Sequence, residues 1–178
     1  MAVLRPVPCV WYSSCRSQNG ASLMTLSFVA TSAQPDLVPQ VVDWLREEFW
    51  HAGSPSREQQ IAKMLAQPDR SEETFVLLDD NVPVGTASLV KNDLPSRPDL
   101  TPWLAGVLVL PPFRGKGYSA PLVHRVEQAA ILSTATLWLY TWSAESVYAK
   151  LGWQRVGTSR DEARGIDVVL MKRNLSRS

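Results

Sequence analysis

The sequence has few of the residues that build disulfide scaffolds and metal sites. It contains two cysteines and two histidines among 178 residues. Cys9 and Cys15 both precede residue 16, so the main part of the chain has no cysteine with which to form a disulfide. His51 and His124 have no second ligand at a metal-binding spacing. We therefore expect no bound metal, and the shortage of cysteine favours a cytoplasmic location.

Long apolar runs and an excess of one charge are also missing. No apolar run reaches the roughly 20 residues that a bilayer-spanning helix needs. The 18 Lys and Arg residues against 17 Asp and Glu residues give a net charge of +1, which is too small to attract nucleic acid or a membrane surface generally. We expect neither as a partner. An apolar content of 45% is typical of a packed globular domain.

The first 23 residues show no regular apolar pattern and are rich in serine. They also lack the charged start and continuous apolar core of a signal peptide. We expect residues 1–23 to be a loosely packed or disordered extension that the fold does not need. Residues 24–178 are then one domain, as the length suggests.

Apolar periodicity predicts a mixed α/β (α+β) protein. We expect Asp36 to cap the first helix and Ser54-Pro55 to begin the second. The expected strands cover residues 25–30, 74–78, 84–90, 107–110, 136–141, 153–157 and 166–171, and the expected helices cover 37–52, 55–67, 119–130 and 143–150. Ser143 is the expected N-cap of the last helix, and Gly152 its left-handed C-cap.

The stretch 107–119 predicts a strand, a glycine-containing basic loop and the start of a helix. Backbone N–H groups at a helix start have no partners within the helix, and the helix dipole favours an anion there. Gly115 and Gly117 let the backbone approach a phosphate closely, and Arg114 and Lys116 add positive charge. This loop is therefore a candidate phosphate site.

Two nucleotide-binding motifs fit this loop poorly. Residues 115–120 match the dinucleotide pattern G-x-G-x-x-G/A, but four residues separate the strand from Gly115. The pattern also needs an acidic residue about 20 positions on, and residues 136–140 contain none. No G-x-x-x-x-G-K-[S/T] motif is present. The spacing therefore disfavours a nucleotide-binding protein.

The loop resembles the acyl-CoA signature R/Q-x-x-G-x-G/A of the GNAT acyltransferase family. Arg114, Gly117 and Ser119 fall on its three positions, and the serine departs from the usual glycine or alanine. The element order β-α-α-β-β-β-α-β-α-β-β over residues 25–175 also resembles the GNAT topology. The resemblance implies a mixed, splayed central sheet flanked by helices. It also implies CoA contacts from Arg114, Gly115, Lys116, Gly117, Tyr118 and Ser119.

A second motif resembles the family pattern A-x-x-x-Y-x-K/R-x-G-F/W. The matching residues are Ala144, Tyr148, Lys150, Gly152 and Trp153. The resemblance implies that Tyr148 is the general acid that protonates the leaving thiolate of CoA, as a positioned phenol can do. The alternative is that its ring only packs under the cofactor.

The resemblance further implies a binding site for the pantetheine arm of CoA. Backbone groups of Val107, Leu108 and Val109 would pair with it, and a strand N–H would polarise the thioester carbonyl. Thr141 stands where the family often has an asparagine that bonds this arm, and its hydroxyl can donate or accept.

The general base has no clear candidate in the sequence. Many relatives use a glutamate on the central strand, but residues 103–107 contain no acid. Asp99, in the proline-rich loop 92–102, is our preferred candidate. A water chain is equally plausible, because positioning alone supplies much of the rate. Other groups that could line the acceptor cleft are Asp93, Glu47, Glu48 and His51.

The resemblance implies an enzyme that uses acetyl-CoA as co-substrate and no metal. It would transfer acetyl to a primary amine of a small molecule or peptide, by direct attack in a ternary complex, as a monomer or homodimer. The alternative function is a non-catalytic acyl-CoA-binding or sensor module of the same fold.

Overall fold

The computed structural model describes residues 25–66 and 71–176. The extension 1–23 and the predicted end of the second helix at Pro68 therefore lie outside the described residues. The strands are β1 (Leu26–Ala30), β2 (Glu73–Asp79), β3 (Val82–Val90), β4 (Trp103–Val109), β5 (Thr136–Thr141), β6 (Gln154–Asp161) and β7 (Ile166–Asn174). The helices are α1 (Val38–Phe49), α2 (Arg57–Leu65), α3 (Ser119–Ala130) and α4 (Glu145–Lys150), and short 3₁₀ turns cover Pro35–Leu37 and Pro111–Phe113.

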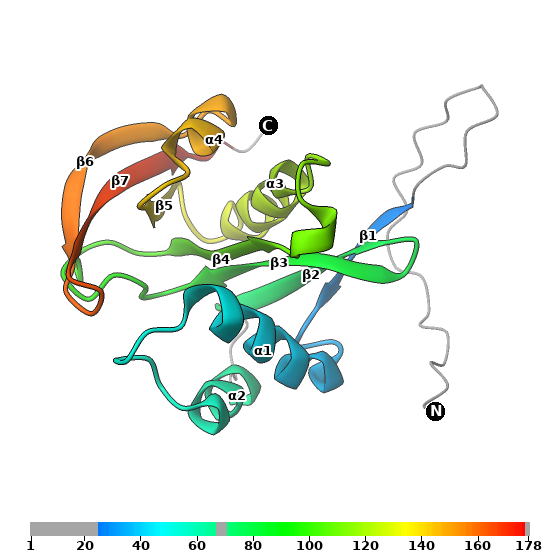
Figure 1. Cartoon of the computed structure of the whole chain (residues 1–178). Helices are drawn as coiled ribbons and strands as arrows, with labels where there is room; N and C mark the ends of the chain where they lie inside the picture. Colours follow the sequence, from blue (N-terminus) through cyan, green and yellow to red (C-terminus); the bar gives the residue numbers. More distant parts are fainter. Residues whose placement is uncertain (1–24, 67–70, 177–178) are drawn as a thin grey trace, which may run out of the picture.

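The predicted order of strands and α-helices is confirmed in the described residues. The strands form one sheet in the order β1-β2-β3-β4-β5-β7-β6. All neighbouring pairs are antiparallel except β4 and β5, which are parallel. Helices α1 and α2 lie on one face of the sheet and α3 lies on the other (Figure 1). The mixed α/β (α+β) class is therefore confirmed.

The main core lies between α3 and the sheet. The side of α3 that faces the sheet carries Leu122, Val123, Val126 and Ala130, all fully buried. These residues recur at helical spacing, so they form one apolar stripe. They pack in one cluster with strand residues that include Leu77. The start of α3, and with it the glycine loop, is held in place by this packing.

The sheet opens at its centre, between β4 and β5. These two strands pair only at Trp103 and Trp138, where the Trp138 N–H donates to Pro102 O at 3.1 Å. Beyond this point they diverge. The register between β3 and β4 also shifts, so that Gly106 and Val107 together oppose one residue of β3. Such a bulge leaves backbone groups of β4 without ladder partners, close to the opening.

Three of the predicted helix starts differ from the structure. Asp36 lies in a 3₁₀ turn, and α1 begins after Leu37 without a side-chain cap. Helix α2 begins after Ser56, whose hydroxyl accepts from the Gln59 N–H while the Gln59 side chain accepts from the Ser56 N–H. This capping box is stronger than the predicted start at Ser54-Pro55, because it satisfies two free donors at once.

The third difference is at α4. Ser143 does not cap it. The Thr141 hydroxyl instead accepts from the N–H groups of Ser143 and Ala144, at 3.3 and 2.9 Å. The helix ends at Lys150, as predicted, and Gly152 just beyond it has a left-handed φ of +85°. Among the described residues, no helix has the length and apolar character to cross a bilayer.

Candidate active site

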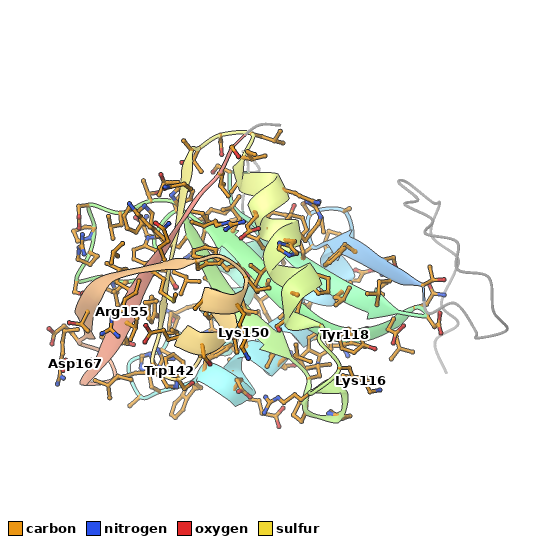
Figure 2. All side chains as sticks on the ribbon, turned by 90° about the horizontal axis from the view of Figure 1, so that it is seen from above. Lys116, Tyr118, Trp142, Lys150, Arg155 and Asp167 are labelled. Carbon is orange, nitrogen blue, oxygen red and sulfur yellow. The ribbon has the colours of Figure 1, made fainter. Side chains whose placement is uncertain are left out.

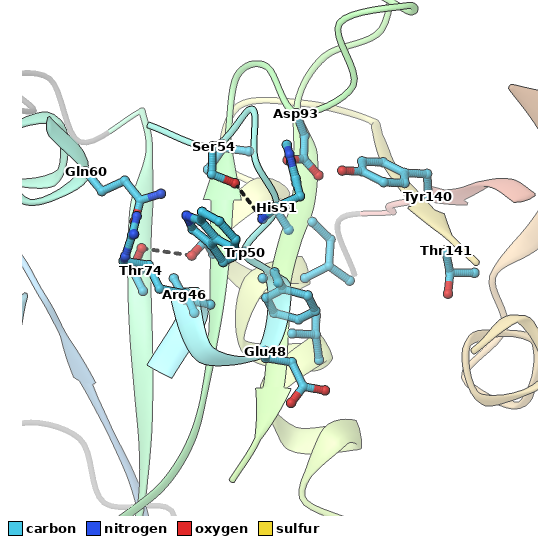
Figure 3. Close-up of a pocket in the computed structure, with 18 of the residues that line it drawn as sticks. Arg46, Glu48, Trp50, His51, Ser54, Gln60, Thr74, Asp93, Tyr140 and Thr141 are labelled. Carbon is cyan, nitrogen blue, oxygen red and sulfur yellow. Dashed lines mark hydrogen bonds between the residues drawn. The ribbon is translucent and has the colours of Figure 1, made fainter. Parts of the chain in front are cut away.

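A cleft of about 600 Å³ lies where β4 and β5 diverge. Its walls come from α1 and α2, from the middle of β4, and from the stretch that joins β5 to α4. Asp93, from the loop after β3, and Arg164, from the turn between β6 and β7, also line it. Figure 3 shows the polar side chains that point into this space. Segments distant in sequence therefore meet here, as expected of an active site.

The glycine loop follows the end of β4. Gly115 and Gly117 have left-handed φ angles of +79° and +82°, which favour glycine. No other atom lies within 4 Å of the place where a Cβ would stand on either residue, so a ligand can approach both. Helix α3 begins at Ser119 without a side-chain cap on its first N–H groups. An open surface of backbone donors at a helix start fits a pyrophosphate.

The two cationic side chains of the loop differ in position. Lys116 is exposed, 5.6 Å from the Phe113 ring (Figure 2). Arg114 turns back toward α1, where it donates to Glu48 Oε2 at 2.7 Å and to Val109 O at 3.0 Å. Arg114 therefore links the loop to α1 in this structure. Its charge stands near the loop, and its Nε and Nη2 donors are used within the protein.

Tyr118 anchors the loop. Its ring is buried, and its hydroxyl donates a short hydrogen bond to the Asp79 carboxylate at the end of β2. This bond to an anion raises the pKa of Tyr118. Tyr118 is one of the six loop residues predicted to contact CoA. Its side chain fixes the loop on the sheet, so only its backbone remains for such a contact.

The bulge in β4 lies at the part of the strand whose backbone was predicted to bind the pantetheine arm. Val107 lines the cleft together with Gly106, whereas Leu108 and Val109 pair with Thr86 and Gly85 of β3. Gly106 has a left-handed φ of +57° and was missed in the sequence. The available signal was a glycine inside a strand pattern, which often marks a bulge.

Tyr148 projects from α4 into the cleft. Its ring packs edge-on against Trp153, with the ring centroids 6.2 Å apart. Burial raises the pKa of Tyr148 to about 12. No hydrogen bond joins its hydroxyl to any other residue that the structure describes. The hydroxyl is thus protonated at neutral pH and available to a ligand.

Thr141 also lines the cleft, but its oxygen already accepts the two N–H groups that begin α4. The hydroxyl still has its proton to donate. Its first contribution is therefore structural, because it sets the start of the helix that carries Tyr148.

The two aspartates of the loop between β3 and β4 lie in different surroundings. Asp99 does not line the cleft. Arg97 holds it with two hydrogen bonds of 2.9 and 2.7 Å at the exposed surface, and this pairing lowers its pKa. Asp93 lines the cleft, and burial raises its pKa to about 6 although Arg164 and Lys63 lie near enough to oppose the shift. Of the two aspartates, Asp93 therefore faces the cleft and Asp99 does not.

Tyr140 stands beside Asp93. Figure 3 shows its hydroxyl pointing toward the carboxylate. Burial and the charge of Asp93 both raise the pKa of Tyr140. Of the other acidic and imidazole candidates, Glu48 and His51 line the cleft and Glu47 does not.

Arg164 is a site residue that the sequence did not indicate. Its guanidinium donates to Asp161 Oδ2 at 2.8 Å and to Phe49 O at 2.7 Å, and lies 4.7 Å from the Trp142 ring centroid. In the sequence it belonged to a polar turn, and no local pattern distinguishes it from an exposed arginine.

Comparison with known proteins agrees with this architecture. The model of a family described as the acetyltransferase (GNAT) family matches residues 38–153, more than half of the chain. No curated protein sequence matches the chain.

Similar solved structures are acetyltransferases. An aminoglycoside 6'-N-acetyltransferase complexed with coenzyme A is 17% identical with a TM-score of 0.67, and the match covers 87% of this chain and 99% of that one. The spermidine N-acetyltransferase from Vibrio cholerae, in complex with CoA and spermine, is 17% identical with a TM-score of 0.64 and coverages of 83% and 95%. A Salmonella typhimurium protein solved with its cofactor acetyl-CoA is 16% identical with a TM-score of 0.66 and coverages of 88% and 96%. At these identities the likeness establishes the fold.

Proposed function

The chain belongs to the acetyltransferase (GNAT) family, and on this basis we propose that it is an N-acetyltransferase. It transfers acetyl from acetyl-CoA to a primary amine of a small molecule or peptide, by direct attack in a ternary complex. Overall, an ammonium ion and acetyl-CoA give an N-acetyl amide, the free thiol of CoA and one proton released to solvent.

One observation carries the proposal. Tyr148 stands in the cleft that the divergence of β4 and β5 creates, and the bulged stretch of β4 lines the same cleft. Strand β4 then leads through a short turn into the open glycine loop. A candidate proton donor and the bulged strand thus line one cleft, and the candidate phosphate loop follows that strand in the chain.

The residues present fit CoA. The backbone N–H groups of Gly115, Lys116, Gly117 and Ser119 would hold its pyrophosphate, because the space before the two glycines is open and α3 has no side-chain cap. The backbone of β4 around Val107 would hold the pantetheine arm. Bound acetyl-CoA supplies a thioester that an amine can attack and a thiolate that needs a proton.

The protein supplies two proton-transfer groups. Tyr148 holds a proton at neutral pH, the state that a general acid needs. Asp93, with a pKa of about 6, is ionised at pH 7 and can accept the proton of an arriving ammonium. The aminoglycoside and spermidine substrates of the structural neighbours support an amine as acceptor.

The test is an acetyl-transfer assay on the full chain, with acetyl-CoA, a panel of amines and free-thiol detection. We expect thiol release that depends on the amine, together with an N-acetyl product in mass spectrometry. Tight CoA binding in calorimetry without acetylation of any amine would instead fit the non-catalytic sensor. Absence of CoA binding would contradict both functions.

A further inference from the structure

The charge of the cleft walls restricts which amine can bind. Among the residues that the structure describes, three cationic side chains line the cleft, Arg46, Lys63 and Arg164, and two carboxylates, Glu48 and Asp93. This described lining therefore has no surplus of negative charge. A polyamine or an aminoglycoside carries several ammonium groups, and such a ligand needs several carboxylates close by to offset their mutual repulsion.

The two carboxylates are already engaged. Glu48 accepts a hydrogen bond of 2.7 Å from Arg114. Asp93 is half-buried, and the positive charges of Arg164 and Lys63 act on it. Asp93 can serve one ammonium group, but the described lining holds no free carboxylate for a second one.

Two of the three cations lack an anionic partner. Arg164 pairs with the buried carboxylate of Asp161. Arg46 donates to the backbone oxygen of Pro55 at 2.8 Å and forms no ion pair within the described residues. Lys63 is exposed on the last turn of α2 and likewise makes no ion pair in that part of the chain. The α1–α2 wall of the cleft therefore has positive charge to offer to a ligand.

Aromatic surface completes the lining. The Trp50 and Trp142 side chains line the cleft although they are 55% and 46% exposed. Trp142 is held by the Arg164 guanidinium and by the Phe49 ring, whose centroid is 6.1 Å away at a steep angle. Two exposed indole rings, of which Trp142 is held in place, favour a ligand with an apolar body.

Resting on the function proposed above, we propose that the acceptor is a single amine that also carries an anionic group, and not a polyamine. Its ammonium group faces Asp93, its anionic group faces Lys63 and Arg46, and its apolar part contacts the two tryptophans. Carboxylates and phosphates share this chemistry. Amino acids and short peptides with a free carboxylate are the simplest members of the class.

The experiment compares acceptors that differ in one group. Phenylalanine is measured against phenethylamine, glycyl-phenylalanine against its C-terminal amide, and phosphoethanolamine against ethanolamine, with spermidine as the polycation. We expect the anion-bearing member of the preferred pair to have a kcat/KM at least about tenfold above that of the analogue without the anionic group, with spermidine lowest. The peptide and phosphate pairs distinguish the two sources of the anion.

Variants of Lys63 locate the effect. Lys63→Gln should raise KM for the anionic acceptor about tenfold, Lys63→Glu should raise it further, and both should leave the KM for acetyl-CoA unchanged. Lys63 makes no ion pair in the described structure, so both variants should fold. Lys172→Gln, on β7 outside the cleft lining, is the matched control and should change neither constant.

Two results would overturn the inference while the proposed function stands. One is faster acetylation of spermidine than of every anionic amine, and the other is an unchanged acceptor KM in Lys63→Glu. A protein that binds CoA but acetylates none of these amines would overturn the inference and favour the sensor function. A protein that does not bind CoA would overturn the function itself.

Discussion

Asp93 and Asp99 lie in one loop between β3 and β4, yet their surroundings give them different chemistry. Asp99 is exposed and held by Arg97, which lowers its pKa and leaves it a weak base. Asp93 is half-buried in the cleft, and loss of hydration raises its pKa to about 6. A base whose pKa lies near the working pH is well suited to proton transfer.

The pH profile should show this difference. A base with a pKa of about 6 must be ionised, so kcat/KM should fall about tenfold per pH unit below pH 6. Asp93→Asn should remove this acid limb of the pH profile and lower the rate about 10²–10⁴-fold. Asp99→Asn should retain the acid limb and the wild-type rate. Steady-state kinetics between pH 5 and pH 9, with controls for stability, tests this. An unchanged limb in Asp93→Asn would assign the titration to another group.

The same pKa shift affects stability. Between pH values of about 4 and 6 the folded protein retains the Asp93 proton, while the unfolded chain has lost it. The folded state then binds more protons, so this group lowers the free energy of unfolding as the pH rises through that window. The free energy of unfolding of Asp93→Asn minus that of the wild type should therefore be more positive at pH 7 than at pH 4.

Tyr148→Phe keeps the ring and removes the proton. The ring contact with Trp153 is retained, so folding and acetyl-CoA KM should change little. If the hydroxyl is the proton donor, kcat should fall about 10²–10⁴-fold. Equal turnover in the two proteins would show that solvent protonates the thiolate and that the tyrosine only packs in the cleft.

At the scale of elements, the strand–loop–helix unit from β4 to α3 should bind the cofactor. Its two ends are fixed by different means. The apolar stripe of α3 buries the helix against the sheet, and the bond from Tyr118 to Asp79 holds the loop. Between these anchors the glycines expose backbone donors to open space. A rigid, open loop can bind an anion without first losing conformational freedom.

Gly117→Val should abolish CoA binding by this loop. A valine at a φ of +82° is strained, and its side chain would fill the open space before the loop. We expect CoA affinity in calorimetry to fall at least about 100-fold, which is about 2.7 kcal/mol. Gly157→Val is the control, because Gly157 of β6 also has a positive φ, of +155°, and open space around it, away from the loop. Unchanged affinity in a folded Gly117→Val protein would remove the loop from the site.

At the scale of the whole molecule, Arg164 joins parts of the chain that are far apart in sequence. Its contacts reach Asp161 at the end of β6, the end of α1 at Phe49, and Trp142 after β5. Phe49 and Trp142 belong to two different walls of the cleft. Because Arg164 and Asp161 are largely buried, loss of the arginine leaves a buried carboxylate without its partner.

Arg164→Ala should therefore lower the free energy of unfolding by about 3 kcal/mol. The control is Arg160→Ala in the same hairpin, where the ion pair with Asp167 is exposed and worth less than about 1 kcal/mol. Urea unfolding of both variants measures the difference. Similar small losses in the two would mean that Arg164 does not hold the walls together.

The local features of this protein could be predicted from the sequence alone. The β4–α3 unit, the left-handed Gly152, and the placement of Tyr148 on a short helix all depend on residues within a few positions of one another. Backbone freedom, capping and apolar periodicity operate at this range. The order of the elements followed from the same patterns.

The acid–base chemistry of the cleft depended on tertiary structure. Asp93 and Asp99 look alike in the sequence, and Arg164 looks like any arginine of a polar turn. Burial and pairing set the chemistry of such groups, and the partners that cause them come from distant segments, as Phe49 does for Arg164. The sequence by itself therefore determined the fold and the glycine loop, while only the packing of distant segments decided which charged side chains line the cleft.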